Sequence, residues 1–305
     1  TPVNNANLPQ IGFNYTGLSP TGAGTRNASL LFGTERSRHF NDLATKTSDA
    51  YLAGTWALGA HEVKGGVDFS RNEIYNAFVQ DTKGNYTFRC LNSTATLTYK
   101  FGAINCATAS AADVAKALLE NFELGRPASY QVQVPANAKG GISDAVAAWT
   151  LNNTGLFLQD TWNVNKQLTL TGGVRLDSAS AGEKPLANAA AAAAVVPGTV
   201  TGLGTGTRQT GGFGLDNTVT LDGAQLVQPR LGFNYKLDPQ GPRRQQVRGG
   251  FGLFQGAAAS VWLSNPYSNT GVALRTIGCG GSFAACPDAG GVFSADPLNQ
   301  PVGFA

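Results

Sequence analysis

The sequence lacks several features that common classes of protein require. Its 305 residues contain no methionine and only two histidines, and Asp, Glu, Lys and Arg together make up 13% of them. That charged share is about half of the roughly 25% usual in a soluble domain. The net charge of +3 gives no electrostatic reason to expect nucleic acid as a partner. No stretch approaches the roughly 20 apolar residues of a membrane-spanning helix.

The beginning of the chain is also unusual. It starts at Thr1 without methionine, and no signal peptide precedes the first polar residues. A complete gene product of this length ordinarily contains methionine. We therefore expect a processed chain or a segment of a longer one.

Motifs of catalytic chemistry are missing from the sequence. It contains no GxSxG and no HExxH, and the glycine-rich stretch 201–214 lacks the Lys-Ser/Thr of a phosphate-binding loop. Asp160 with Asp177, and Glu62 with Asp68, are acid pairs by residue type, but strands with alternating charges explain them more simply. The sequence therefore predicts no enzyme and no cofactor.

Four cysteines form two local pairs, Cys90 with Cys106 and Cys279 with Cys286. Neither pair has CxxC spacing, and His39 and His61 are the only histidines, so a zinc site is not expected. Two local disulfides in an oxidising compartment are the main interpretation. Four free buried thiols, or a cross-pairing between the two regions, remain as alternatives.

Glycine-containing hairpins recur three times along the chain. The units are AYLAGTWALGAHEVKGGVDF (50–69), TGLFLQDTWNVNKQLTLTGGVRLD (154–177) and RLGFNYKLDPQGPRRQQVRGGFGLF (230–254). Each is a strand that ends in an aromatic residue, a polar turn, and a returning strand that contains Gly-Gly. Such alternation predicts antiparallel sheet with one apolar face. The turns are expected at 59–60, 163–166 and 238–244.

The phase of the alternation is the same in all three units. A slip of one residue would turn every side chain to the other face, so the agreement fixes the predicted faces. The apolar face contains Leu52, Trp56, Val63, Val67, Phe69, Leu168, Leu170, Val174, Leu176, Leu231, Phe233, Tyr235, Val247, Phe251 and Leu253. The opposite face contains the charges Lys64, Asp68, Arg175, Asp177 and Arg248.

Long connections separate the three hairpins. We place the hairpins near 42–78, 146–177 and 226–256, and the connections near 80–145, 178–225 and 257–305. Short turns at one end and long loops at the other are typical of a transmembrane β-barrel, whereas a soluble β-sandwich, the alternative, turns every 8–12 residues. The fold class is therefore all-β: an antiparallel transmembrane barrel or part of its wall, with long extracellular loops.

The barrel interpretation assigns a role to each face. The apolar face is expected to contact outer-membrane lipid, and the charges Lys64, Asp68, Arg175, Asp177 and Arg248 are expected to face the lumen. Trp56, Trp162 and Tyr235 stand next to the turns, where an aromatic girdle meets the membrane surface. Asp160 shares the parity of the lipid face, so we expect it at the headgroup level or at a local bulge.

One connection contains a helix signal. In SAADVAKALLENFELG (110–125), Ser110 and Asp113 form a capping box, and Gly125 is a stop. Val114, Leu118, Leu119 and Phe122 form its apolar face. Packing of this face against its own loop is favoured over a partner surface.

Several motifs together resemble a known family. LFGTERSR (31–38), VKGGVDFSRNEIYNAF (63–78), QDTW, TLTGGVRLD, QPRLGFNY, RGGFGLF and VWLSNPYSNTGV occur in an order that resembles the Oar-like TonB-dependent receptors of Gram-negative outer membranes. The resemblance implies a 22-stranded plugged barrel, energy from the TonB complex, and a bulky substrate such as peptide or protein. Residues 1–305 would then be a single barrel segment, in which no plug domain is seen.

Two other functions remain open at the level of sequence. The chain would also suffice for a smaller, self-contained porin-like barrel, since eight to ten strands fit within 305 residues. A structural or adhesive outer-membrane surface protein is the third possibility, because long loops suit contacts between cells.

Overall fold

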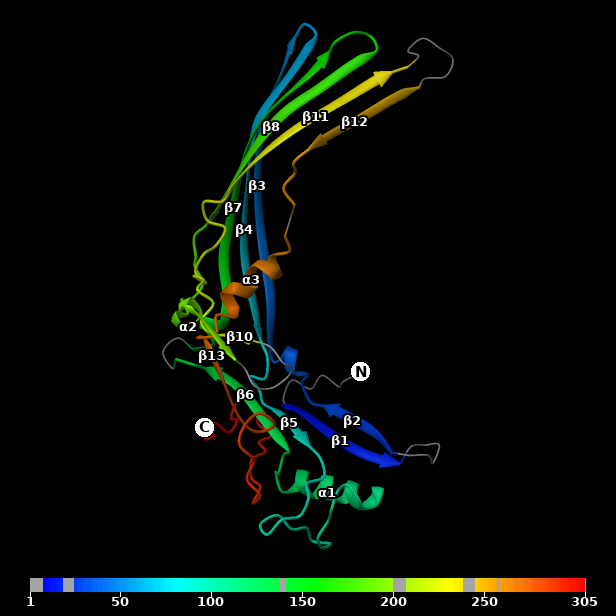
Figure 1. Cartoon of the computed structure of the whole chain (residues 1–305), viewed down its shortest axis with the longest axis vertical. Coiled ribbons are helices and arrows are strands. Elements are labelled where there is room, and N and C mark those ends of the chain that lie inside the picture. The colour runs from blue at the N-terminus through cyan, green and yellow to red at the C-terminus, as the bar shows by residue number, and fades with distance from the viewer. Residues whose placement is uncertain are drawn as a thin grey trace. The chain divides into compact units, whose positions relative to one another are not determined.

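The computed structural model describes residues 8–18, 25–137, 141–199, 207–237, 245–256 and 258–304 (Figure 1). The chain divides into two compact units. Unit 1 contains residues 1–42, 77–145 and 271–305, and unit 2 contains residues 43–76 and 146–270. The sequence led us to expect one barrel segment with extended loops, and the structure differs because the connections between the hairpins fold into packed structure.

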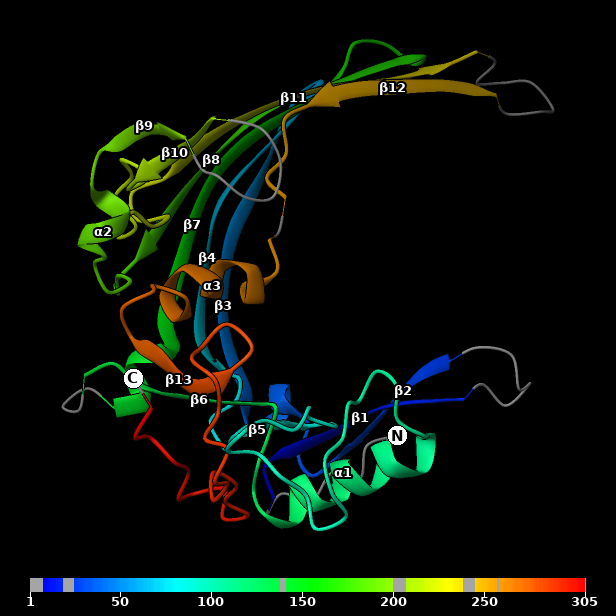
Figure 2. The ribbon, with the colours of Figure 1, turned by 60° about the horizontal axis from the view of Figure 1, so that its bottom comes forward.

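Unit 2 is built on a six-stranded antiparallel sheet that curves along the length of its strands (Figure 2). Its order is β12-β11-β8-β7-β4-β3, so the strands of this sheet lie side by side in the order in which they occur along the chain. The strands are β3 (Phe40–Leu58), β4 (His61–Val79), β7 (Val146–Asn163), β8 (Leu168–Ala181), β11 (Gln225–Lys236) and β12 (Gln246–Gly252). The three predicted hairpins are β3–β4, β7–β8 and β11–β12. The third predicted turn, 238–244, lies outside the described residues.

The register of the strands confirms the predicted phase. Trp162 is opposite Leu170, and Leu158 is opposite Val174. Across the next two ladders Leu231 is opposite both Gly172 and Phe251. The apolar residues of four neighbouring strands therefore share one face.

The glycine pairs have a steric role in this sheet. A Cβ on Gly66 would lie 2.7 Å from the Phe157 ring, and one on Gly249 would lie 3.0 Å from the Phe233 ring. The missing side chains therefore make room for large rings on neighbouring strands. Gly59, in the turn between β3 and β4, has a φ of +64°, which glycine adopts without steric cost.

Shorter elements complete unit 2. The helix α2 (Ala189–Ala192) begins after Asn188, in a run of alanines, and β9 (Val195–Thr199) pairs with β10 (Thr207–Gly211). The motif VWLSNPYSNTGV (261–272) overlaps α3 (Ser260–Ser268). Trp149 of β7 stacks on Tyr267 at 5.0 Å and donates from Nε1 to Ser264 Oγ at 3.1 Å, so α3 packs on the sheet.

Unit 1 contains a second sheet that the sequence did not predict. Its order is β13-β6-β5-β1-β2. The strands are β1 (Gln10–Leu18), β2 (Thr25–Phe32), β5 (Asn85–Phe88), β6 (Ser129–Pro135) and β13 (Leu274–Gly280). The pair β1–β5 is parallel, an exception to the antiparallel expectation. The connections 80–145 and 257–305 therefore contribute strands to this sheet and are not extended loops.

Aromatic residues form the core of unit 1. Tyr86 stacks on Tyr130 at 4.5 Å, and Phe88 and Phe122 meet edge to face at 5.1 Å. The Tyr86 hydroxyl donates to Gln300 Oε1 at 2.7 Å, and the Tyr130 hydroxyl donates to the Pro301 carbonyl at 2.9 Å. These bonds tie the C-terminal segment to the sheet. Burial raises the pKa of Tyr86 to about 12, so this hydroxyl stays a donor at physiological pH.

Both predicted disulfides are present in unit 1. Cys90 bonds to Cys106 with Cα atoms 5.9 Å apart, and Cys279 bonds to Cys286 with Cα atoms 4.7 Å apart. The first joins a segment that packs, through Leu97, Tyr99 and Ile104, around Ala117 of α1 (Ala111–Glu123). The cross-pairing and the free-thiol alternatives are therefore not what the structure contains.

Helix α1 begins as its sequence predicts. The Ser110 side chain accepts from the Asp113 N–H at 3.1 Å. Val114 and Leu118 are buried, and Phe122 packs against Phe13 of β1 at 5.1 Å. The expectation for Leu119 was wrong: it is exposed, since the stripe that packs includes Ala117 and Asn121 instead. The helix packs within its own unit, as favoured.

Near its end the motif LFGTERSR contributes Arg36 to a polar cluster around the buried Asp81. Arg36 Nη2 donates to Asp81 Oδ2 at 2.5 Å, and Gln131 Nε2 donates to the same oxygen at 2.6 Å. His39 is buried, with Nε2 3.1 Å from the Thr34 carbonyl and Nδ1 3.1 Å from the Lys83 N–H. A carbonyl only accepts and an N–H only donates, so His39 is neutral with its proton on Nε2. Burial holds its pKa below the ordinary value.

Candidate membrane-spanning wall and its inner face

The apolar face of the six-stranded sheet is exposed. Phe251 is 75% exposed and Leu52 is 73% exposed, fractions far above those of core residues. The same face also exposes Trp56, Leu58, Phe69, Leu156, Leu158, Trp162, Val174, Leu231, Phe233, Tyr235, Val247 and Leu253. A soluble protein rarely exposes so large a contiguous apolar surface, whereas lipid contact requires one.

This apolar face has a defined limit along the strands. On β4, Val63, Val67 and Phe69 are followed on the same face by Arg71 and Glu73. Arg71 Nε lies 2.9 Å from Glu73 Oε1, and Lys46 Nζ of β3 lies 4.0 Å from Glu73 Oε2. On β8 the apolar residues end at Leu176 and are followed by serines. Charged and hydroxyl side chains therefore replace apolar ones at a similar distance from the turns.

The height of the apolar band matches a bilayer. From Leu168 to Leu176 the strand rises by about 26 Å at ~3.3 Å per residue. A tilted strand spans somewhat less, and the apolar band of an outer-membrane barrel is about 25 Å tall. With 19 residues each, β3 and β4 are longer than the 9–11 residues of a tilted crossing, so they continue beyond the band.

The three turn-proximal aromatics lie on this apolar face. Trp162 is opposite Leu170 and Tyr235 is opposite Leu168, so the two rings are about one pleat apart along β8. Trp56 is two residues from the end of β3, and its ring lies over Gly65. All three are exposed next to the turn end of the sheet. Their role as an aromatic girdle stays a prediction.

Asp160 shares the apolar face, and His61 is its partner. His61 Nδ1 lies 2.7 Å from Asp160 Oδ2, and the His61 ring stacks on Trp162 at 5.4 Å. Asp160 is opposite Gly172 in an unbroken ladder, so no bulge displaces it. The pairing with a histidine at the turn end is the way in which the fold accommodates this carboxylate.

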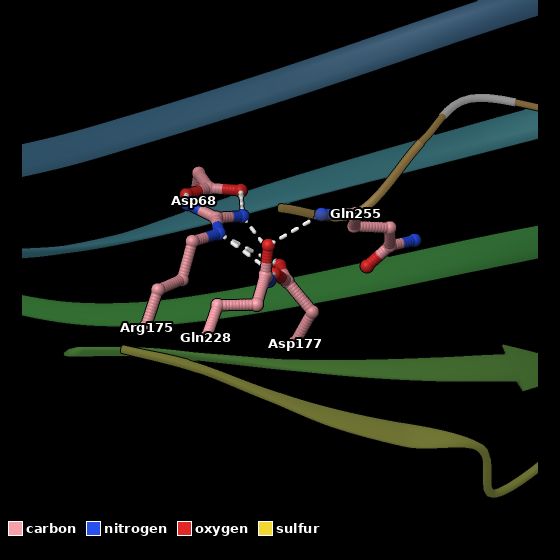
Figure 3. Close-up of polar contacts among 5 residues, drawn as sticks. All are labelled: Asp68, Arg175, Asp177, Gln228 and Gln255. Atoms are coloured by element: carbon pink, nitrogen blue, oxygen red, sulfur yellow. Dashed lines mark hydrogen bonds and ion pairs between the residues drawn. The ribbon is translucent and has the colours of Figure 1, made fainter. Parts of the chain in front are cut away.

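Polar side chains from three strands meet on the opposite face (Figure 3). Arg175 of β8 donates through Nη1 and Nη2 to the two carboxylate oxygens of Asp68 of β4, at 2.5 and 2.9 Å. Arg175 Nε donates to Asp177 Oδ2 at 2.8 Å. Gln228 of β11 donates to Asp177 and accepts from the Gln255 N–H at 2.6 Å.

This network is saturated. The bidentate geometry of Arg175 on Asp68 is the strongest form of arginine–carboxylate pairing. Asp177 and Gln228 are more than nine-tenths buried. Gly155 opposite Asp177 leaves room for the arginine, since a Cβ there would lie 2.1 Å from Arg175 Nη2. The arrangement cross-links three strands and leaves no charge of Arg175 for another ligand.

The predicted lumen-facing charges divide into two groups. Asp68, Arg175 and Asp177 are brought together by the network, whereas Lys64 and Arg248 lie outside it. Arg248 lines a shallow hollow of about 400 Å³ with Thr169, Thr171 and Asn234. The lumen as their environment stays a prediction.

Two parts of the inner face were not predicted from the sequence. Gln228 completes the network. It is two residues before Arg230 on the same strand, so the alternation places both side chains on the polar face, and this was the only sign of its position in the sequence. Helix α3 covers part of the polar face through Tyr267, and only the motif VWLSNPYSNTGV marked it. Among the described residues no group of three or more His, Cys, Asp or Glu is placed to hold a metal.

None of the helices in the described part of the chain is long and apolar enough to cross a membrane.

Comparison with known protein families supports the interpretation of the six-stranded sheet as part of a barrel wall. The family model described as "Outer membrane beta barrel domain" matches residues 2–292. The chain belongs to this family of outer-membrane barrels, and it is therefore a protein of the Gram-negative outer membrane. The open six-stranded sheet is consistent with part of a barrel wall. A search among curated proteins finds no match to the sequence.

Two solved structures are similar to the chain. They are the open and closed forms of the ferric-catecholate import receptor Fiu from E. coli K12. The open form is 16% identical over 70% of this chain, with a TM-score of 0.27, and the closed form is 15% identical over 74%, with a TM-score of 0.28. The chain spans 25% and 26% of those receptor chains.

Proposed function

We propose that this chain is part of the barrel wall of a TonB-dependent outer-membrane receptor that transports a bulky substrate, such as a peptide or protein. The observation that supports the proposal is the contrast between the two faces of the six-stranded sheet. One face presents a continuous apolar band of bilayer height. The other contains a hydrogen-bonded network of charged side chains, which a wet or plugged lumen accommodates.

The ordered motifs favour a receptor over a passive pore. Most of the stretches that resemble Oar-like receptors belong to the wall or to the segment after it: QDTW is in β7, TLTGGVRLD is in β8, QPRLGFNY is in β11, RGGFGLF begins in β12, and VWLSNPYSNTGV overlaps α3. Helix α3 packs against the polar face of the sheet at Trp149, so a segment of this chain occupies space on the side proposed to face the lumen. A plugged receptor is consistent with an interior occupied by protein.

Two measurements on the complete gene product test this proposal. The periplasmic domain of TonB, added to the purified receptor in detergent, should bind it in a pull-down. In planar lipid bilayers the receptor should be closed, because a plugged barrel does not conduct. Steady open channels without TonB binding would instead support the porin-like alternative.

The substrate requires a separate experiment. A pull-down of the native protein, followed by mass spectrometry of the bound material, should recover a peptide or protein above the background of an unrelated outer-membrane barrel. Recovery of whole neighbouring cells or their surface proteins, with no TonB dependence, would support the adhesive alternative.

A further inference from the structure

After β12 the chain leaves the sheet and returns across its polar face. The Leu253 N–H donates to the Pro229 carbonyl at 3.0 Å, and the Gln255 N–H donates to Gln228 Oε1 at 2.6 Å. Further along, Trp149 holds α3 through Ser264 and Tyr267. We call residues 253–256 and 258–268 the strap. It is anchored at two places, and a groove of about 930 Å³ lies between it and the wall.

The size of this groove is that of a ligand site. Small-molecule sites have volumes of roughly 300–1,000 Å³ and combine apolar surface with a few convergent polar groups. Leu226 and Leu263 supply apolar surface, and Phe254 of the strap lies at the groove with 71% of its surface exposed. An exposed aromatic ring next to polar side chains is available for a ligand to stack on.

Uncharged groups dominate the polar part of the groove. Hydroxyl and carboxamide side chains line it from the wall and from the strap, namely Thr45, Thr47, Asn72, Asn153, Gln225 and Gln255. Thr47 Oγ1 donates to Asn72 Oδ1 at 2.8 Å, which orients that amide. Carboxamides donate and accept at once, and hydroxyls do the same, so together they suit a ligand that both donates and accepts.

The charges of the groove are already paired. Arg175 and Asp177 are the charged residues among its described lining, and they bind each other and Asp68. A charged ligand would have to break these contacts, or be desolvated without a partner, and both are unfavourable. The groove therefore favours a ligand without net charge.

The groove lies on a face of the sheet and not at an edge. β8 pairs with β7 on one side and with β11 on the other, so its backbone groups are used in ladders. A peptide that adds as a strand needs a free edge. Recognition in the groove must therefore come from side chains, which favours a ligand with hydroxyl groups on its own surface.

We propose that the strap groove binds an uncharged oligosaccharide. Its hydroxyls exchange hydrogen bonds with Asn72, Asn153 and Gln255, and a sugar ring stacks on Phe254. The inference relies on the proposed function only in placing the groove inside the barrel. It names a second ligand class for the inner wall, distinct from the peptide or protein substrate proposed above.

Calorimetry on the complete protein in detergent tests the proposal. The probes are maltohexaose, chitohexaose and xylohexaose, with a neutral hexapeptide of Gly and Ser as comparison. Saturable binding of at least one sugar is expected, and little or no binding of the peptide. Binding of none of the three sugars, or tighter binding of the peptide, would overturn the assignment.

Matched variants locate the site. Asn153→Leu should weaken sugar binding at least tenfold, and Phe254→Ala similarly, whereas Asn234→Leu should leave it within twofold. Asn153 and Asn234 are both on the polar face of the same sheet, but Asn234 lies outside the groove. Thr45→Val, a nearly isosteric change, provides a second test if Asn153→Leu misfolds. Equal effects of the Asn153 and Asn234 variants would refute the site. TonB binding and bilayer conductance, measured on the same samples, report separately on the proposed function.

Discussion

The two units use alternating strands in opposite ways. In unit 2 the apolar residues of the six-stranded sheet are on the outside, where Phe251 and Leu52 are the most exposed of them. In unit 1 the large residues of the five-stranded sheet are inside, and Tyr86, Phe88 and Tyr130 are almost completely buried. The same residue types therefore serve lipid contact in one unit and a water-excluded core in the other.

The contrast extends to what holds each unit together. Unit 1 combines an aromatic core with two disulfides, whereas the wall of unit 2 combines hydrogen-bonded ladders with an ion-pair network. All four tryptophans of the chain belong to unit 2. Tryptophan fluorescence therefore reports on unit 2 alone, and hydrogen exchange measured peptide by peptide reports on each unit separately.

The largest effect is expected on the lipid face. Phe251→Arg should destabilise the membrane-inserted barrel by about 2–4 kcal/mol, because a cation near the middle of the band has no water to solvate it. Urea unfolding in lipid vesicles, followed by tryptophan fluorescence, measures this. Thr171→Arg, on the polar face, is the control and should be much milder. Equal losses would show that the two faces are wrongly assigned.

The disulfide of Cys90 and Cys106 provides the matching test in unit 1. In the chain-entropy model, closing a loop of about 15 residues stabilises a fold by roughly 3 kcal/mol. The Cys90→Ser/Cys106→Ser variant should therefore lose hydrogen-exchange protection in the peptides of β5, β6 and α1. The peptides of β7 and β8 should keep theirs. A parallel loss in both units would mean that they do not respond separately.

A smaller effect is expected from the ion-pair network. Arg175→Met leaves Asp68 and Asp177 without their shared cation, and should destabilise unit 2 by about 2 kcal/mol, less than the loss at a fully buried pair. Urea unfolding in vesicles again measures it. Arg248→Met, a surface change on the same face, should stay within about 0.5 kcal/mol. Further substitution of Asp68 by Asn in the Arg175 variant should restore part of the loss, and a failure to do so would argue against the pairing.

The smallest effect concerns pH and unit 1. His39 is buried and neutral, so its pKa in the folded state is below the unfolded value of about 6.5. Its contribution to stability is complete above that value and is lost as the pH falls toward the folded pKa, by at most about 1.4 kcal/mol per pH unit. Asp81, Glu35 and the backbone of Thr34 oppose the shift, and Lys83 adds to it.

Hydrogen exchange of the peptides of unit 1 at pH 7.5 and pH 5, corrected for the intrinsic pH dependence of exchange, measures this dependence. His39→Gln, which retains a donor toward the Thr34 carbonyl, should flatten it. The variant would leave the pH dependence unchanged only if other groups cause it.

The sequence predicted unit 2 far better than unit 1, and the reason is physical. The hairpins of unit 2 are local, so the phase of Leu168–Leu176 and the glycine pairs could be deduced from one stretch at a time. In the sheet of unit 1, β1 pairs with β5 and β6 pairs with β13, and the partners are far apart in the sequence. Such pairings leave no periodic signal that identifies the partner. The capped helix α1 and the disulfides were predictable because their partners are nearby in sequence.

The candidate site was predicted in part for the same reason. The charges Asp68, Arg175 and Asp177 were assigned to one face by parity, but their mutual contacts depend on which strands are neighbours. Gln228 was missed because an uncharged residue gives no sign of burial beside a carboxylate. The strap was missed because its path over the wall follows from contacts of Trp149, 115 residues before Ser264.

The strand order of unit 1 has a consequence for how the chain folds. Its sheet needs β13, which ends at Gly280, in order to cover β6, and β1, which begins at Gln10, in order to pair with β5. The hairpins β3–β4 and β7–β8 close over turns of two and four residues and need no distant segment. Loop-closure entropy makes distant pairings slow relative to local ones. The wall hairpins are thus the early structures, and the sheet of unit 1 forms only after segments as distant in sequence as β1 and β13 have come together.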